Sequence, residues 1–200
     1  HAYSDTEKDP HSPHFFKDVW DMMMHTRNIY NAFLVGKNVP EAEFTKDYLP
    51  VWSKMDKIGD SLLTRILWIA GYVSFYVAFA PAWYWYLLLP IHALMGPVQG
   101  AIVNWVGHKY GYSNFDNGDQ SKNSERWGIF LLGELFQNNH HRYCTSANFA
   151  QRWFEIDPCY VIIRALALVR IVKLNDANVP YEQPGDELSW GVPLAAAKEA

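Results

Sequence analysis

Charged side chains are missing from one long stretch of this chain. No Asp, Glu, Lys or Arg occurs between Arg65 and Lys109. This run is about twice the ~20 residues that a helix needs to cross a bilayer. Near its middle stands Pro81, followed by aromatic residues at positions 83–86. A proline followed by amphipathic rings is typical of a turn at a lipid–water interface, so the pattern predicts two apolar helices joined as a hairpin.

We expect the two membrane spans at about residues 63–80 and 86–107. Gly96 and Gly100 would let another helix approach the second span closely. The alternative is a hairpin buried in a soluble protein, but soluble helices rarely lack charge for so long. The short middle turn has no basic residue, whereas both flanks do, and the positive-inside rule therefore places both ends in the cytosol. The flanking cations are Lys54, Lys57, Arg65 and Lys109.

Outside the hairpin the pattern is polar and more broken. It predicts a helix at 15–33, a polar loop at 110–124, and a helix at 125–142 that runs toward a His-His pair. Residues 158–173 form a basic amphipathic segment that suits a membrane surface. The tail 174–200 is rich in Pro, Gly and Ala, and we expect it to be loosely ordered.

Composition agrees with one membrane domain over residues 1–173. Half of the 200 residues are hydrophobic and 16% are aromatic, both high for a soluble protein. The net charge of −4 gives no basic surface for nucleic acid, and two cysteines, Cys144 and Cys159, cannot form a disulfide framework. We therefore expect an all-α, multi-pass integral membrane protein, a two-span hairpin plus a cytosolic helical cap that carries a histidine cluster.

Eight histidines supply the candidate chemistry. Asn104 and His108 share a helix face at the end of the second span, where an Asn either belongs to a functional site or bonds a neighbouring helix. His140 and His141 diverge by about 100° on a helix and can serve two neighbouring metals, and Gln137 shares a face with them. The pattern favours an imidazole-rich, two-metal site, for which iron fits. Zinc sites more often use four closely spaced ligands.

The N-terminal residues include a further group of candidates: His1, Asp5, Glu7, Asp9 and His11. Carboxylates in such a segment usually face solvent. The alternative is that they accept the second N–H of a metal-bound imidazole, as oxygen acceptors commonly do. Of the remaining histidines, we expect His14 and His25 at the surface, and His92 as a hydrogen-bonded interior residue.

These motifs, in their order along the chain, resemble those of the membrane fatty-acyl desaturases of the stearoyl-CoA (delta-9) type. Residues 1–11 resemble the segment that begins at the last His of the family's second histidine box, HxxHH. Residues 104–108 resemble its NxxxH element, 133–141 its third box, GEGxHNxHH, and 152–157 a downstream segment. We therefore expect a C-terminal fragment, inactive alone, that lacks the first box and most of the second.

The resemblance implies an O2-dependent oxidoreductase of unsaturated fatty acid biosynthesis that introduces a cis double bond, at delta-9, into a saturated acyl chain. Two iron ions would be bound by His1, His108, His140 and His141, with Asn104 acting through water. Gln137 stands where the family has a His and is a further candidate ligand. No catalytic side chain beyond these ligands is expected. Electrons would come from a separate carrier of ferredoxin, rubredoxin or cytochrome b5 type.

The resemblance also bears on the substrate, an acyl chain carried by CoA or by a membrane lipid. Family members place a basic pair near the CoA phosphates where this chain reads His25-Thr26-Arg27-Asn28, and of these only Arg27 is always cationic. This departure leaves room for an acyl-lipid substrate. Arg27 and Trp105 are the candidate substrate-binding residues, and we expect the protein in a bacterial cell membrane.

Two other functions stay open at this point. The first is a di-iron fatty-acid hydroxylase on the same scaffold, which a hydroxylated product would identify. The second is a non-catalytic, metal-binding membrane protein, for which zinc in place of iron and an absence of O2 consumption would be diagnostic.

Overall fold

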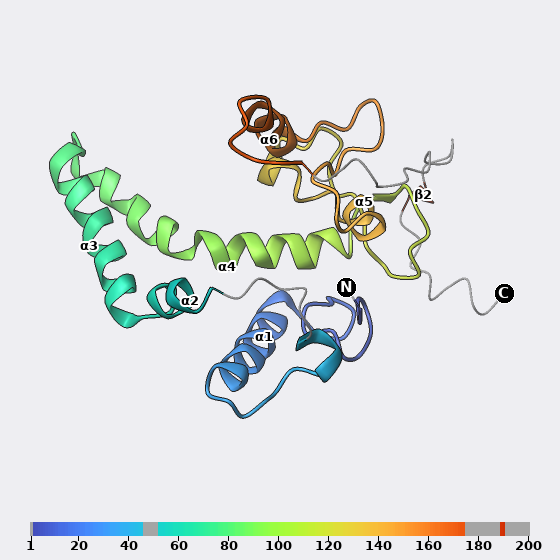
Figure 1. Cartoon of the computed structure of the whole chain (residues 1–200), viewed down its shortest axis with the longest axis horizontal. Helices are drawn as coiled ribbons and strands as arrows, with labels where there is room; N and C mark the ends of the chain where they lie inside the picture. The colour runs from blue at the N-terminus through green and yellow to red at the C-terminus, as the bar shows by residue number, and fades with distance from the viewer. Residues whose placement is uncertain (1, 46–51, 175–188, 191–200) are drawn as a thin grey trace. The chain divides into compact units, whose positions relative to one another are not determined.

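The computed structural model describes residues 2–45, 52–174 and 189–190 (Figure 1). The chain divides into two compact units. We call Asn31–Val98 the hairpin unit, and His1–Tyr30 with Gln99–Ala200 the polar unit. Most of the tail expected to be loosely ordered, 174–200, lies outside the described residues.

The hairpin unit contains the apolar helix α3 and the first part of a second apolar helix, α4, whose residues from Gln99 onward belong to the polar unit. Helix α3 begins where the Ser61 hydroxyl accepts a hydrogen bond from the Thr64 N–H at 3.1 Å, a cap that satisfies one of the unpaired N–H groups of the first turn. It ends shortly before Pro81, which cannot continue a helix. The elements in chain order are η1 (Ala42–Thr45), α2 (Ser53–Gly59), α3 (Leu62–Phe79), η2 (Trp83–Leu87) and α4 (Leu88–Gly107).

Both helices are long and apolar enough to cross a membrane. α3 has 18 residues and α4 has 20, close to the length that a bilayer core requires. Within these helices only Tyr76 of α3 and Gly107 of α4 are buried, whereas the core helix of a soluble domain would bury its apolar side chains. The prediction of two apolar helices is confirmed, with bounds at 62–79 and 88–107 in place of 63–80 and 86–107.

A polar contact joins the two apolar helices near the turn that connects them. The Tyr76 hydroxyl and His92 Nε2 lie 2.8 Å apart in a hydrogen bond, and the Tyr72 ring stacks on the imidazole with centroids 5.1 Å apart. A polar side chain in a span is costly unless it has a partner. The expectation that His92 is a hydrogen-bonded interior residue is confirmed.

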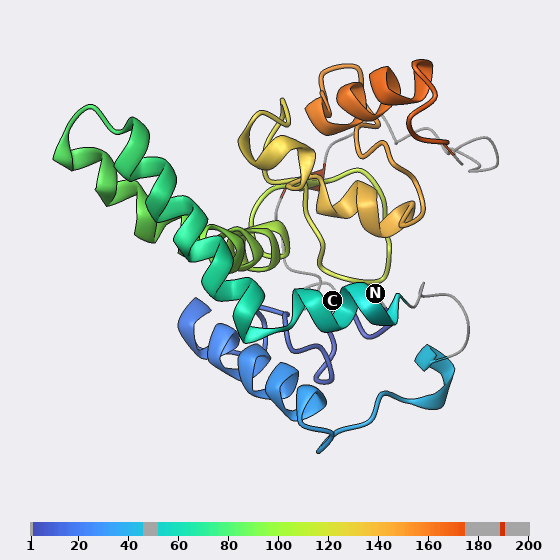
Figure 2. The ribbon, with the colours of Figure 1, turned by 60° about the vertical axis from the view of Figure 1, so that its left-hand side comes forward.

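The polar unit contains short helices joined by long connections (Figure 2). Its first helix, α1 (Val19–Leu34), starts later than the expected 15–33, because the Asp18 carboxylate accepts the Asp21 N–H at 2.8 Å and marks the helix start. The expected loop at 110–124 contains the strand β1 (Tyr112–Ser113), which pairs antiparallel with β2 (Ser189–Trp190). The remaining elements are η3 (Phe130–Gly133), α5 (Gln137–Arg142) and α6 (Pro158–Leu168).

The helix predicted at 125–142 is wrong. Only η3 and the six-residue α5 form there, because the backbone turns left-handed at Leu131 (φ 53°), Leu132 (φ 56°) and Gly133 (φ 97°). A right-handed helix cannot pass through such residues. Because of this break, His140 and His141 lie on a short separate helix, α5.

A buried carboxylate, Glu155, organises the core of the polar unit. Its Oε1 accepts hydrogen bonds from the Tyr112 hydroxyl at 2.6 Å and from Asn114 Nδ2 at 2.8 Å. Its Oε2 accepts three more, from Asn139 Nδ2 at 2.8 Å and from two backbone N–H groups, those of residues 151 and 152. A carboxylate satisfied by five donors is a rigid anchor in a low-dielectric interior. Because Asn139 precedes His140 directly, this anchor positions α5.

Candidate metal centre

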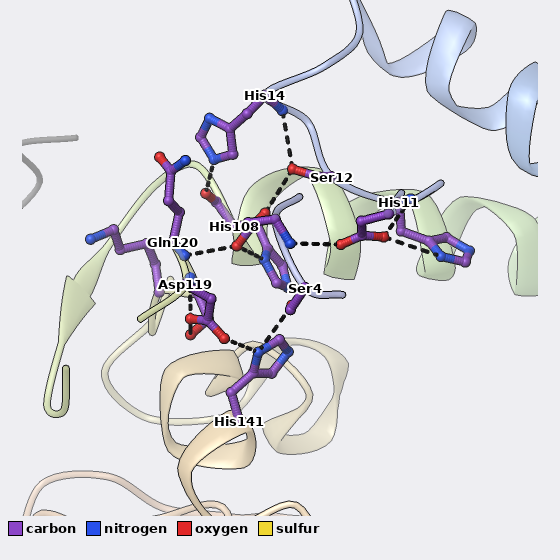
Figure 3. Close-up of polar contacts among 12 residues, drawn as sticks. Ser4, His11, Ser12, His14, His108, Asp119, Gln120 and His141 are labelled. Carbon is purple, nitrogen blue, oxygen red and sulfur yellow. Dashed lines mark hydrogen bonds and ion pairs between the residues drawn. The ribbon is translucent and has the colours of Figure 1, made fainter. Parts of the chain in front are cut away.

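One cavity of the polar unit is lined by four of the seven histidines in the described residues. Its volume is about 320 Å³, and the polar contacts around it are drawn in Figure 3. The end of α4, the N-terminal segment and α5 each contribute to its walls. The lining residues are Ser4, Asp9, His11, Val103, Asn104, His108, Glu134, Gln137, His140 and His141.

His108 follows the last residue of α4 and is held by a buried carboxylate. Its Nδ1 lies 2.8 Å from Asp5 Oδ2, and both side chains are buried. Asp5 also accepts hydrogen bonds from the Ser12 hydroxyl at 2.7 Å and from the Gln120 N–H at 2.8 Å. Burial alone would raise the pKa of Asp5, but the hydrogen bond and the charge of His108 outweigh it and lower this pKa. Asp5 is therefore ionised at neutral pH.

His141 is held in the same manner from another segment. Its Nδ1 lies 2.6 Å from Asp119 Oδ2, and Asp119 also accepts a hydrogen bond from the Ser121 N–H at 3.0 Å. Burial opposes ionisation of Asp119, but the hydrogen bonds from His141 and Ser121 prevail and lower its pKa to about 2. The loop before α5 thus fixes the orientation of the imidazole.

These two carboxylate–imidazole pairs have a direct chemical meaning. A carboxylate at Nδ1 favours the tautomer with the proton on Nδ1, so the lone pair that can bind a metal lies on Nε2. The rings of His108 and His141 meet with centroids 4.8 Å apart. Two imidazoles from distant parts of the chain are therefore oriented into one cavity. Asp5 makes the carboxylate–imidazole contact that the alternative role of the N-terminal carboxylates requires.

His140 is the third imidazole of the cavity, and His11 is the fourth. Burial, followed by the nearby charge of His141, lowers the pKa of His140 to about 4, so its ring is neutral at physiological pH, as a metal ligand requires. The ring packs against Phe149 with centroids 4.5 Å apart. Its neighbour His141 lies at 5.9 Å between centroids, nearly perpendicular.

Two amides, Asn104 and Gln137, line the same cavity. Asn104 Nδ2 donates to the Gly100 carbonyl at 2.8 Å, and Gln137 Nε2 donates to the Glu134 carbonyl at 2.8 Å. In both, the nitrogen is engaged by backbone, which leaves the amide oxygen as the atom suited to a metal or its water. A Cβ at Gly107 would lie 2.6 Å from Gln137 Cγ, so only glycine at that position permits this close approach.

The other candidate residues are not among the described residues that line the cavity. His1 lies outside the described residues. Among the described residues that line the cavity, neither Arg27 nor Trp105 occurs; Arg27 is exposed, and the Trp105 ring is covered by the Lys109 ammonium at 4.4 Å. His14 is exposed, as predicted, but its Nε2 also lies 2.9 Å from the His108 carbonyl oxygen in a hydrogen bond.

Sequence reasoning missed two acidic residues of the site. Asp119 stands in an Asn-Gly-Asp stretch that reads as a turn, and only its pairing with His141 reveals its role. Glu134 lines the cavity as part of the recognised third motif. Burial, with a contribution from the charge of Asp157, raises the pKa of Glu134. No local pattern distinguishes Asp119 from an ordinary loop residue.

The donor set fits iron by its chemistry. Within residues 2–45, 52–174 and 189–190, no three His, Cys, Asp or Glu side chains already stand close enough to hold one metal ion. The cavity nevertheless presents four imidazoles, those of His11, His108, His140 and His141. Two of them are bonded at Nδ1 to buried carboxylates, which is the support that metal-binding histidines usually have. Imidazoles with carboxylate and amide oxygens suit iron among other first-row metals.

Several curated desaturases are similar in sequence to this chain. The chain is 29% identical over 187 residues to an sn-1 stearoyl-lipid 9-desaturase of Anabaena variabilis, covering 88% of this chain and 62% of the relative. It is 28% identical to Delta-9 acyl-lipid desaturase 2 of Arabidopsis thaliana, covering 91% and 56%, and 27% identical to an acyl-CoA 5-desaturase of Anemone leveillei, covering 95% and 56%. The chain thus spans little more than half the length of these relatives.

No solved structure shows significant similarity to the chain. The model of the fatty acid desaturase family matches residues 1–174, nearly all of the described sequence. This match includes both apolar helices and every described residue of the cavity. The chain is a membrane protein and belongs to the fatty acid desaturase family.

Proposed function

We propose that the full-length protein is an O2-dependent fatty-acyl desaturase that introduces a cis double bond at delta-9 of a saturated acyl chain. The observation that carries the proposal is the pair of buried carboxylate–imidazole contacts, Asp5 with His108 and Asp119 with His141, which aim two Nε2 atoms into one cavity. Family membership supports the reaction class, and two of the relatives named above are delta-9 lipid desaturases.

The described residues would hold part of a di-iron centre. His108, His140 and His141 would bind through imidazole nitrogen, Asn104 would approach through water, and Gln137 through its amide oxygen. His1, and residues of the full-length protein outside this chain, would complete the set. When bound, iron supplies the activation of O2 and the acceptance of electrons from a carrier protein. Asp5 and Asp119 keep the Nδ1 protons in place and hold the rings at fixed angles.

An acyl chain esterified to a membrane lipid is the favoured substrate. Arg27, the one fixed cation where the family places a basic pair, is exposed and is not among the described residues that line the cavity. The apolar helices α3 and α4 keep the chain within the bilayer, where lipid substrates are found. We infer that both ends of the hairpin face the cytosol, because cations flank it and its middle turn has none. A separate electron carrier of ferredoxin, rubredoxin or cytochrome b5 type would dock from that side.

The decisive experiment expresses the full-length protein in a host that lacks unsaturated fatty acids and analyses the lipids by gas chromatography. We expect a new monoene with its double bond at carbon 9, at the glycerolipid stage. The variant His141→Ala should abolish it, while His92→Gln, which alters a histidine bonded inside the hairpin, should retain it. Finding no new monoene would refute the proposal, and a hydroxylated product would identify a hydroxylase.

A further inference from the structure

Within the polar unit, one group of exposed apolar side chains lies on η3, the segment before it, and α6. Figures 1 and 2 both draw η3 and α6 side by side, and the two elements are in contact. Phe130 is 73% exposed and Leu168 80% exposed. Contiguous exposed apolar patches on a folded unit mark an interaction surface. We call this set the η3–α6 face: Trp127, Ile129, Phe130, Leu132, Val161, Ile162, Ala165, Leu168 and Val169.

The exposed side of α6 is an apolar stripe. Val161, Ala165 and Leu168 follow the i, i+4, i+7 spacing that places side chains on one helix face, and all three are exposed. The opposite side, with Tyr160 and Ile163, is half-buried. The helix therefore turns apolar residues outward where a soluble helix would present charge.

Cations stand at the edge and end of this stripe. Arg164 flanks it and is exposed. Beyond the helix, a hollow of about 470 Å³ is lined by residues 167 and 170–174, among them Arg170 and Lys173. An apolar stripe bordered by Arg and Lys is the pattern of a helix that lies in the plane of an anionic membrane surface.

Arg170 occupies a backbone position that normally belongs to glycine. The Arg170 N–H bonds to the Ala167 carbonyl at 3.0 Å, and the Ile171 N–H bonds to the Leu166 carbonyl at 2.9 Å, which together form the Schellman ending of a helix. In that motif the residue at Arg170 adopts a left-handed conformation, here with φ 62°. Glycine is favoured there because it lacks a Cβ. A strained arginine in its place suggests that the guanidinium has a function.

We propose that the η3–α6 face lies in the interfacial layer of the bilayer, and that Arg170 and Lys173 bind the phosphate of an anionic lipid headgroup. The occupant is the membrane itself, because the face combines exposed apolar residues with cations, and because the polar unit continues directly from the apolar helix α4. Long Arg and Lys side chains beside an apolar stripe can reach the headgroups while their apolar stems stay against the stripe. This anchor does not depend on the reaction at the histidines.

A depth measurement on the full-length protein tests the face. All native cysteines, including the exposed Cys144 and Cys159, are replaced, and a spin label is placed at Leu168→Cys. In nanodiscs of phosphatidylglycerol and phosphatidylcholine, we expect the label to collide with O2 and to be shielded from a water-soluble nickel chelate. A label at the exposed loop residue Asp116 should show the reverse. Nickel access at 168 would overturn the proposal, and so would shielding from both reagents, which would mean that another part of the protein covers the face.

A second measurement tests the headgroup site. A fluorophore at position 168 is quenched by nitroxide-labelled phosphatidylglycerol or phosphatidylcholine, and the ratio of the two association constants is determined. Arg170→Gly should lower this preference for phosphatidylglycerol about fivefold, while the strain-relieving glycine leaves the helix end intact. Arg170→Lys keeps the charge and should keep the preference. An unchanged ratio in Arg170→Gly would overturn the headgroup site.

Discussion

Replacing Glu155 with glutamine should destabilise the polar unit while changing hardly any volume. The carboxylate accepts two hydrogen bonds at Oε1 and three at Oε2, whereas a glutamine amide offers one acceptor oxygen. The favourable orientation of the amide keeps its oxygen at the Oε2 position with three donors. Its NH2 group then faces the Tyr112 hydroxyl, which can rotate to accept, and Asn114 Nδ2, which cannot.

The geometry around Asn114 sets the magnitude. Asn114 cannot flip its amide, because its Oδ1 accepts a hydrogen bond from Arg152 Nε and its Nδ2 donates to Asn139 Oδ1 at 2.7 Å. One Asn114 N–H is therefore left facing another donor, at a cost of about 1–3 kcal/mol. The three remaining bonds also lose the negative charge of their acceptor, roughly 0.5 kcal/mol each. We expect a total loss of about 3 kcal/mol, a large part of a typical domain's stability.

Thermal unfolding of the purified full-length protein in detergent measures this loss. At about 2 °C per kcal/mol for a protein of this size, Glu155→Gln should lower Tm by about 6 °C. The matched variant Tyr112→Phe removes one donor, leaves no buried group unpaired on the carboxylate, and should cost about 1 kcal/mol. If Glu155→Gln unfolds within about 2 °C of the wild type, or no lower than Tyr112→Phe, the five-donor anchor is not what stabilises the unit.

Three other predictions concern pH, metal and backbone. Burial, followed by the charge of the Glu155 carboxylate, raises the pKa of Tyr112 above its ordinary value of 10. The neutral Tyr112 hydroxyl therefore stabilises the fold below pH 10, and this stabilisation is lost progressively as the pH rises above 10. The Tm gap between wild type and Tyr112→Phe should shrink above pH 10, and a gap that widens there would contradict this. Asp119→Asn should weaken iron retention against a chelator by about 10–100-fold, measured by elemental analysis with Asp116→Asn as control; equal retention in the two variants would count against the Asp119–His141 pair. Gly128→Ala should prevent folding or cost more than about 3 kcal/mol, because its Cβ would lie 1.8 Å from the Ile156 carbonyl oxygen at a left-handed φ of 60°; normal expression and Tm would disprove that packing.

The apolar helices could be predicted from the sequence because their signal is local. A charge-free run interrupted by Pro81 permits few other structures, and the i, i+4 spacing of Asn104 and His108 follows from helical geometry alone. The cavity accordingly contains Asn104, His108 and the predicted residues of α5. The sequence therefore identified the candidate metal-binding side chains that lie on or next to helices α4 and α5.

The supporting residues could not be predicted because tertiary contacts determine them. In the sequence Asp119 looks like an ordinary turn residue, and only the folded structure shows its contact with His141. The left-handed backbone at Leu131 and Leu132 contradicts the helical preference of leucine, so the pattern at 125–142 indicated one helix where two short ones form. Asp5 was foreseen only as one of several N-terminal carboxylates.

The separation of these pairs along the chain has a consequence for biosynthesis. Asp119 and His141 are 22 residues apart and can pair soon after that stretch leaves the ribosome. Asp5 and His108 are 103 residues apart, with both apolar helices between them. At a translation rate of about 5–20 residues per second, His108 is synthesised about 5–20 s after Asp5. The contact between Asp5 and His108 can therefore form only after both apolar helices have been synthesised. A defect in the folding of the hairpin would then prevent the Asp5–His108 contact while leaving the Asp119–His141 contact able to form.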